Sequence, residues 1–214
     1  MTWPRVAGVL PLVLAACADA TRSVDYADGS PWSAIALEDG VQEGPWRTWW
    51  PGGAPKSEEH WRAGRPHGPY RAWWADGTPR VEGEYEDGRM TGRWRTWYAD
   101  GRPRSDERWV AGRRDGPSTL WHANGQLRQE ATYDEGDLDG AIRTFYPDGS
   151  PESLGTLLDG RRHGEWQSWW PNGHPHVRGT FVRGRPVGRA TWWHEDGSVD
   201  ESKSREYPAR GGQR

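Results

Sequence analysis

Apolar and polar residues alternate over short stretches along most of this chain, and glycine-containing pairs separate the stretches. On both sides of Asp76-Gly77, from Tyr70 to Tyr85, every second residue is apolar or small, and arginine and glutamate occupy positions between them. A period of two is the pattern of β-strands with one apolar and one polar face. No stretch between the glycines is long enough for a helix, so the chain is predicted to be all-β.

Three series of glycines show that the strands belong to a repeat of 24 residues. Each series has seven members in fixed phase, without any insertion. Periods of this size are typical of stacked supersecondary units. The series are Gly40, Gly64, Gly88, Gly112, Gly136, Gly160 and Gly184; Gly44, Gly68, Gly92, Gly116, Gly140, Gly164 and Gly188; and Gly53, Gly77, Gly101, Gly125, Gly149, Gly173 and Gly197.

Each unit is predicted to be a two-stranded hairpin. The pair Asp76-Gly77 recurs as Asp-Gly or Asn-Gly in most units, and such pairs favour two-residue type I′ turns because both residues tolerate positive φ. The second turn of each unit, such as Asp87-Gly88, joins one hairpin to the next. The predicted fold is an elongated single-layer antiparallel β-ribbon of about seven 24-residue hairpin repeats, and the ribbon should be twisted.

The turn position also predicts which side chains share a face. If Asp76 and Gly77 form the loop, Tyr70, Ala72, Trp74, Pro79, Val81, Gly83 and Tyr85 lie on one, apolar, face. On the other face Arg71 should meet Glu82, and Trp73 should meet Arg80. Steps of 24 extend these ion pairs and cation–aromatic pairs to Arg47 with Glu58, Arg95 with Asp106, Trp49 with Lys56, Trp97 with Arg104, and Trp121 with Arg128.

The N-terminus has the pattern of an export signal. A basic start, the apolar run Val6 to Leu14 and small residues precede Cys17, the one cysteine in the chain. Leu14-Ala15-Ala16-Cys17 resembles a bacterial lipobox, which implies a lipidated Cys17, a membrane contact through it, and an exported, lipid-anchored protein of the outer membrane or periplasm. The alternative is an ordinary buried cysteine beside an apolar strand. The predicted organisation is a signal peptide at 1–16, a tether at 17–23, a half-repeat cap at 24–43, the repeat array at 44–205 and a polar tail at 206–214.

Composition changes this picture in two respects. A mean hydropathy of −1.04 would by itself predict disorder, but 17 Trp and 7 Tyr recur in phase and supply the area that stacked units can bury on one another. The formal net charge is −3, with Arg and Glu interspersed and no basic block. This distribution argues against nucleic acid as a partner.

The stretch Glu82-Gly83-Glu84-Tyr85, with Asp87-Gly88, Gly92 and Asp100-Gly101 after it, resembles the MORN repeat, and most closely the bacterial variant found in YwqK-type antitoxins. The resemblance covers about residues 24–205. It implies the same single-layer ribbon, and it associates such arrays with protein partners, scaffolding or phospholipid head groups. Some units depart from the pattern and should be looser: Ser118, Ile142 and Ala190 replace an aromatic on the first strand, and Leu157 and Arg205 replace one on the second.

The candidate binding residues are two rows of aromatic side chains on the apolar face. A one-layer sheet cannot bury both sides, so we expect part of these rows to contact an unidentified protein partner. The alternative is that the rings only cover one another and the glycines. The residues are Trp50, Trp74, Tyr98, Tyr146 and Trp170 in one row, interrupted by His122 and His194, and Trp61, Tyr85, Trp109, Tyr133 and Phe181 in the other.

A third row of tryptophans is predicted on the polar face, where flat rings at one-repeat spacing would suit an extended glycan. Arginine stems covering these rings are the alternative. The row comprises Trp49, Trp73, Trp97, Trp121, Trp169 and Trp193.

Catalysis, metal and cofactors are not expected. The sequence has no nucleophile-elbow, Walker or paired-acid motif. His174 and His176 would share a strand face but lack further ligands, and the carboxylates at 58, 82, 106 and 130 are better explained by ion pairing. The sequence therefore favours a lipid-anchored binding or scaffold protein, with an antitoxin or immunity protein and a glycan- or cell-wall-binding protein as alternatives.

Overall fold

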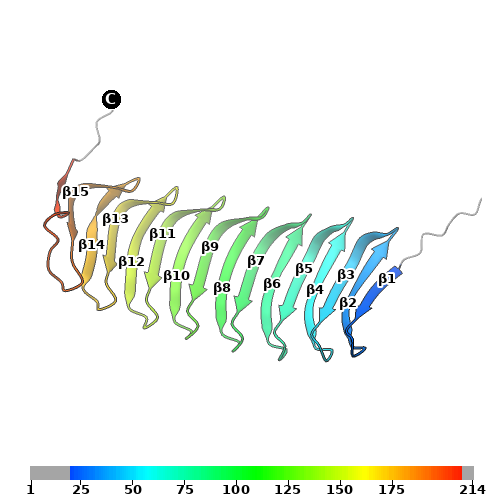
Figure 1. The fold of residues 1–214 in the computed structure, drawn as a ribbon. Coiled ribbons are helices and arrows are strands. Elements are labelled where there is room, and N and C mark those ends of the chain that lie inside the picture. The colour runs from blue at the N-terminus through cyan, green and yellow to red at the C-terminus, as the bar shows by residue number, and fades with distance from the viewer. Residues whose placement is uncertain (1–19, 209–214) are drawn as a thin grey trace, which may run out of the picture.

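The chain folds into one open antiparallel sheet in which strand order equals chain order (Figure 1). The computed structural model describes residues 20–208, so Cys17 and the predicted signal peptide lie outside the described residues. The fold class predicted from the sequence is confirmed. The strands are β1 Ala20–Asp25, β2 Pro31–Glu38, β3 Val41–Trp49, β4 Pro55–Arg62, β5 Arg65–Trp73, β6 Pro79–Glu86, β7 Arg89–Trp97, β8 Pro103–Val110, β9 Arg113–Trp121, β10 Leu127–Asp134, β11 Asp137–Phe145, β12 Pro151–Leu158, β13 Arg161–Trp169, β14 Pro175–Val182, β15 Arg185–Trp192 and β16 Arg205–Tyr207.

Seven of the turns, those leading from an even-numbered to an odd-numbered strand, are two-residue turns. In the turn between β6 and β7, Asp87 has φ 47° and Gly88 has φ 82°, and Glu86 pairs with Arg89. Positive φ at both central residues is the signature of type I′. The amide of Gly88 also donates to the carbonyl of Pro66 in the preceding unit at 2.7 Å, and this bond recurs along the array. These turns therefore join neighbouring units as well as neighbouring strands.

The Asp-Gly and Asn-Gly pairs do reverse the chain, but the predicted type I′ geometry is wrong for them. Of the pair between β5 and β6, Gly77 has a positive φ (86°) and Asp76 does not. Gly77 donates its amide to Trp74 O at 3.0 Å, and Trp74 donates to Thr78 O at 2.9 Å. This is a longer loop closed by a glycine in the left-handed region. Asp76 Oδ1 stabilises it by accepting a hydrogen bond from Thr78 N at 2.9 Å.

The longer loop places one extra residue in the second strand, and this corrects the predicted cation–aromatic pairs. Trp73 pairs with Pro79 rather than with Arg80. The Arg80 guanidinium instead lies 5.6 Å from the ring centre of Trp74. Lys56 lies over Trp50 and Arg104 over Tyr98 in the same way. The predicted pairs of Trp49, Trp73 and Trp97 with these cations are therefore wrong by one position.

The ion pairs on the polar face follow the predicted pattern in part. Arg47 and Glu58 pair at 2.9 Å, as expected. Glu82 is bound by Arg95 at 2.8 Å instead of Arg71, and Asp106 is bound by Arg93 instead of Arg95. Glu82 has an arginine on each adjacent strand, Arg71 on β5 and Arg95 on β7, and register alone does not select between them. Arg95 binds Glu82, and Asp106 pairs with Arg93, which lies two residues away on the same strand.

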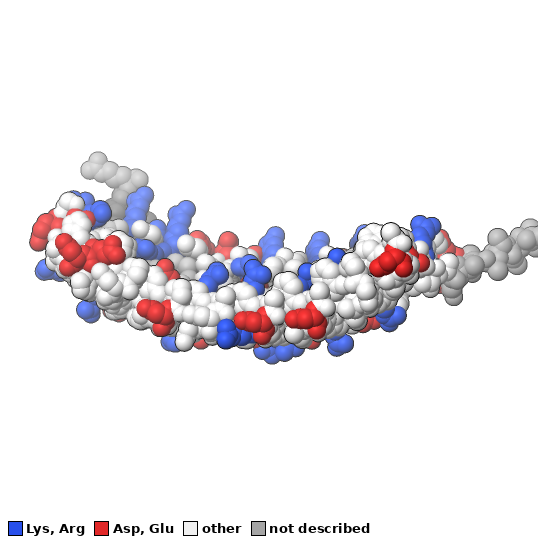
Figure 2. Space-filling model, turned by 60° about the horizontal axis from the view of Figure 1, so that its bottom comes forward, with Lys and Arg blue, Asp and Glu red and all other residues white. Residues whose placement is uncertain are grey.

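A second irregularity bends each odd-numbered strand from β3 to β15. Between β6 and β7 the register changes from Glu82↔Arg95 to Glu84↔Thr91, so β7 contains two more residues than β6 over this stretch, with Gly92 among them. Extra residues in one strand of a pair bend it and increase its twist. The whole body is accordingly curved, and Figure 2 shows a crescent with basic and acidic side chains interspersed along it.

The buried side chains lie on the face that was predicted to be apolar. Trp94 is 5% exposed because its ring lies against Gly83, where any Cβ would overlap the ring; Trp166 covers Gly155 in the same way. The small side chains of the units expected to be looser are nevertheless buried. Ser118 is 2% exposed and Ala190 is 1% exposed, because small side chains at these positions are covered by their neighbours. The continuous core lies in the second half of the chain: Ala131, Tyr133, Ile142, Leu157, Trp166, Val177 and Phe181.

Both ends of the array differ from the sequence assignment. β1 begins at Ala20, so it takes up residues 20–23 that were assigned to the tether. At the other end Gly188 pairs with Tyr207, as Gly164 pairs with Phe181 one unit earlier. Tyr207, rather than Arg205, therefore occupies the aromatic position, and its ring centre lies 5.7 Å from that of Trp192.

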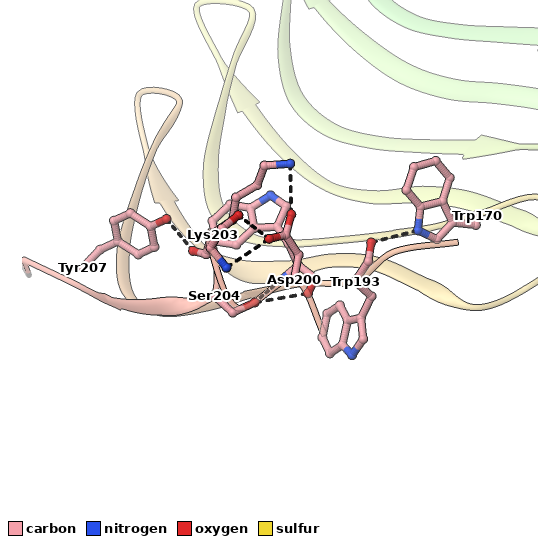
Figure 3. Close-up of polar contacts among 8 residues, drawn as sticks. Trp170, Trp193, Asp200, Lys203, Ser204 and Tyr207 are labelled. Carbon is pink, nitrogen blue, oxygen red and sulfur yellow. Dashed lines mark hydrogen bonds and ion pairs between the residues drawn. The ribbon is translucent and has the colours of Figure 1, made fainter. Parts of the chain in front are cut away.

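A turn anchored by Asp200 makes this shift of register in the last unit (Figure 3). Asp200 accepts hydrogen bonds from the Ser202 hydroxyl and from Ser202 N, and it pairs with Lys203 at 3.1 Å. The bond from the Ser202 hydroxyl, followed by that from Lys203, lowers the pKa of Asp200 to about 2. The hydroxyl of Tyr207 donates to Lys203 O at 2.7 Å. The turn thus fixes the last strand onto β15.

Candidate binding site on the apolar face

The first predicted row of binding residues lies beside the Asp-Gly loops, where it joins the units to one another. Trp50 Nε1 donates to Trp73 O at 3.3 Å, and Tyr98 Oη donates to Trp121 O at 2.8 Å. Tyr146 and Trp170 make the same bond to the next unit. Each ring of this kind bonds a carbonyl 23 residues further along the chain. Among the five predicted residues Trp74 differs, since its buried Nε1 has no hydrogen-bond partner among the described residues.

The second predicted row is divided by burial. Tyr133 and Phe181 are 9% and 3% exposed, so they belong to the core of the second half. Trp61, Tyr85 and Trp109 are half-buried. Binding through either row remains a prediction, but the half-buried rings are the ones that a partner could reach.

A further row of aromatic side chains was missing from the predicted site. It comes from the odd strands and comprises Trp46, Tyr70, Trp94 and Trp166. The ring centres of Trp46 and Trp61 are 5.8 Å apart, and so are those of Tyr70 and Tyr85. The sequence does contain a signal for this row, because its members stand two residues after Gly44, Gly68, Gly92 and Gly164.

Two arginines cover the apolar face in the second half of the array. The guanidinium of Arg114 lies 5.6 Å from the ring centre of Trp109 and 5.0 Å from that of Tyr133, and it donates to the Tyr133 hydroxyl at 2.9 Å. Arg114 also pairs with Glu107 at 3.1 Å. Arg162 lies over Trp166 and Phe181, and burial lowers its pKa. In the first half Gln42, Pro66 and Met90 occupy the equivalent positions. Lys56 and Arg80 lie over Trp50 and Trp74 beside the loops, but among the described residues no cation lies over Trp46, Trp61, Tyr70 or Tyr85.

Glu59 lies among the uncovered rings of the first half. It stands between Trp46 and Tyr70 in the register and accepts a hydrogen bond from Trp61 Nε1 at 3.1 Å. Burial raises the pKa of Glu59, and the hydrogen bond from Trp61 partly opposes that shift. Burial also raises the pKa of Tyr85, and the Glu59 carboxylate adds to it. Within residues 20–208 no Lys, Arg or His forms an ion pair with Glu59.

The third row, on the polar face, is unbroken. Its six predicted tryptophans are half-buried, and Phe145 occupies the position between Trp121 and Trp169. Proline faces most of these rings across the hairpin, as Pro55 faces Trp49 and Pro103 faces Trp97. The row therefore forms an apolar strip along the polar face, beside the Asp-Gly loops.

The two histidines that were considered as metal ligands make other contacts. His174 Nδ1 lies 2.9 Å from Glu195 O, and the ring of His176 packs against Trp170 with centres 4.0 Å apart. In the part of the chain that is described, no three His, Cys, Asp or Glu side chains are grouped to hold a metal ion. The same residues include no helix that could cross a membrane.

Comparison with known families finds the MORN repeat variant in two places, residues 114–135 and 162–183. The two matches start 48 residues apart, which is two periods of the repeat, and they begin at Arg114 and Arg162. No curated protein matches the chain. The matched units are thus those in which an arginine covers the apolar face.

Proposed function

We propose that this protein is a lipid-anchored MORN-repeat scaffold of the bacterial envelope, which binds another protein through the first half of its apolar face. One observation carries the proposal: Trp46, Trp61, Tyr70 and Tyr85 are half-buried on a face that no second layer covers within residues 20–208. Aromatic rings clustered on an open surface are typical of protein interfaces. The MORN-type repeat supports a role in binding rather than in catalysis.

Binding is tested by comparing one ring on each face. Trp61→Ala removes an uncovered ring of the apolar face, and Trp97→Ala removes a half-buried ring of the polar face as the matched control. Proteins that co-purify with the wild-type chain from native membranes should be lost with Trp61→Ala and retained with Trp97→Ala. If both variants retain the same proteins, the partner does not bind through the apolar face.

The envelope location is supported by the lipobox-like segment that ends at Cys17. Only two residues separate Cys17 from Ala20, the first residue of β1, and the three steps between them span at most about 11 Å. A lipid on Cys17 would therefore hold the first units of the array close to the membrane surface. Cys17→Ser should move the protein from the membrane fraction to the soluble fraction, and continued fractionation with membranes would contradict the anchor.

A glycan or cell-wall polymer is the second candidate partner, and the unbroken row on the polar face favours it. Units two strands wide place successive rings about 10 Å apart, so several rings could stack on one extended chain of sugars. Retention on insoluble peptidoglycan should fall for the double variant Trp73→Ala/Trp97→Ala. Retention equal to that of the wild type would exclude this candidate.

An immunity protein that neutralises a toxin would be a special case of the protein-binding role. The resemblance of the repeats to those of antitoxins supports it. A toxin encoded beside this gene and co-purifying with the wild type, but not with Trp61→Ala, would identify that partner.

A further inference from the structure

The repeat places equivalent residues two units apart, and one such pair of sites shares a carboxylate and two aromatic rings but differs in whether a cation is present. Glu59, Trp61 and Tyr85 correspond to Glu107, Trp109 and Tyr133, each 48 residues later. At the later site the guanidinium of Arg114 pairs with Glu107, lies over both rings and donates to the Tyr133 hydroxyl. The residue equivalent to Arg114 at the earlier site is Pro66, which carries no charge.

The register confirms that the two positions are equivalent in space as well as in sequence. Pro66 pairs with Trp61 across β4 and β5, and Arg114 pairs with Trp109 across β8 and β9. The earlier site thus has the carboxylate and the aromatic rings of the later one without its cation. It also has more aromatic surface, because Tyr70 stands where the later site has Ser118.

We infer that the site formed by Glu59, Trp46, Trp61, Tyr70 and Tyr85 binds an arginine side chain supplied by a protein partner. Arg114 shows within this chain how such a site holds a guanidinium: the group lies over two aromatic rings, and its N–H groups reach a carboxylate and a phenol. A planar guanidinium suits both contacts, since it can stack and donate hydrogen bonds at the same time.

The electrostatic state of Glu59 supports this assignment. A half-buried carboxylate without a cation is disfavoured in its charged form, and burial raises the pKa of Glu59 accordingly. The charged groups next to Glu59 lie on the opposite face: Glu58 and His60 adjoin it on β4, and Arg47 and Arg71 pair in register with Glu58. Arg47 is also bound to Glu58 by an ion pair. An incoming guanidinium would therefore neutralise a charge that the fold leaves unpaired.

The site is tested with a short peptide, acetyl-Gly-Arg-Gly-amide, titrated into the wild-type protein while the indole N–H resonance of Trp61 is followed by NMR. The matched peptide contains citrulline, which keeps the shape of arginine and lacks its charge. Binding of the arginine peptide should be weak, about millimolar, and the citrulline peptide should bind at least about tenfold more weakly. Equal binding of the two peptides, or no shift of Trp61 with either, would overturn the inference.

Two glutamates that are neighbours in sequence provide the protein control. Glu59→Gln removes the carboxylate of the site, and Glu58→Gln removes a carboxylate from the opposite face. Affinity for the arginine peptide should fall about tenfold in Glu59→Gln and stay unchanged in Glu58→Gln; equal affinity in the two variants would contradict the site. If Glu59→Gln does not fold, the comparison of the two peptides on the wild type decides the question.

Tetramethylammonium tests whether the site prefers arginine to other cations. Tighter binding of this ion than of the arginine peptide would overturn the assignment to arginine.

The inference depends on the proposed function only for the source of the arginine. If the peptide binds but the same proteins co-purify with Trp61→Ala as with the wild type, the arginine site is supported and the protein-binding role is contradicted. If a protein co-purifies with the wild type but not with Trp61→Ala, and the peptide does not bind, the protein-binding role is supported and the arginine site is contradicted.

Discussion

The two halves of the apolar face are built on the same repeat, but one is closed and the other is open. In the second half Arg114 and Arg162 cover the rings, and seven buried residues form a continuous cluster. In the first half Pro66 and Met90 occupy the arginine positions. Trp94 is buried there against Tyr70 and Tyr85, but Trp46, Trp61, Tyr70 and Tyr85 themselves remain half-buried. A single-layer sheet can therefore cover one of its faces with its own long side chains. Where those side chains are absent, the same repeat leaves a surface for another molecule.

The largest expected effect comes from removing a covered ring. Trp166→Ala should lower the free energy of unfolding by about 3–5 kcal/mol, because it empties space in the closed half. Trp46→Ala, at the equivalent position in the open half, should cost clearly less because part of its ring already contacts water. Urea unfolding followed by circular dichroism measures both. Equal losses would mean that the two halves are packed alike.

The next effect concerns the glycine beneath that ring. Gly155→Ala places a methyl group into the ring of Trp166 and should destabilise the protein by about 1–3 kcal/mol. Gly173→Ala is the control, because a Cβ there meets no atom within 4 Å and only its φ of 83° is unfavourable. The control should cost about 1 kcal/mol. A smaller loss at Gly155 than at Gly173 would show that the ring can move aside.

Removing a covering arginine should open the closed half. Arg114→Met takes away the partner of Glu107 and the cover of Tyr133, and we expect a loss of about 1–2 kcal/mol. Met is the matched choice because Met90 occupies the same position one unit earlier. The indole of Trp109 should then respond to the arginine peptide as Trp61 does in the wild type. Absence of that response would show that the two sites differ in more than their arginine.

The smallest effect is local and depends on pH. Because the folded pKa of Asp200 is about 2, below the ordinary value of about 3.9, the ionised form stabilises the last unit above pH 4. That contribution should be lost as the pH falls from about 4 to 2. Amide exchange of β16 should accelerate over this range, and Asp200→Asn should exchange quickly at all pH values. A pH-independent wild type would contradict the role of this turn.

Much of the fold could be predicted because the repeat fixes both the strand period and the turn positions. The alternation around Asp76-Gly77 identified the apolar face, and all of the continuous core lies on it. The turn class could not be predicted, since Asp-Gly also suits a longer loop in which only the glycine has positive φ. That one-residue difference moved Arg80 from Trp73 to Trp74, and the local pattern contains no sign of it.

The candidate site was predicted less completely. The sequence pattern predicts Trp61 and Tyr85 as binding residues, whereas Trp46 and Tyr70 come from the other strand of the unit and do not belong to the predicted rows. Among the described residues Glu59 has no cationic partner, and this depends on which arginines lie nearby in space rather than in sequence. Pairing Pro66 with Trp61, and Arg114 with Trp109, requires the register of the second turn. Tyr207 enters its row only because the Asp200 turn adds residues to the last unit.

The most direct test of this account is to give the open half the residue that closes the other half. In Pro66→Arg, the new guanidinium should reach Glu59 and Tyr85 as Arg114 reaches Glu107 and Tyr133. Pro66→Met is the control, because it makes the same change to the backbone without adding a charge. We predict that the arginine peptide no longer shifts the Trp61 resonance in Pro66→Arg, while Pro66→Met binds it as the wild type does. If Pro66→Arg still binds the peptide with wild-type affinity, the open and closed halves do not differ in the way described.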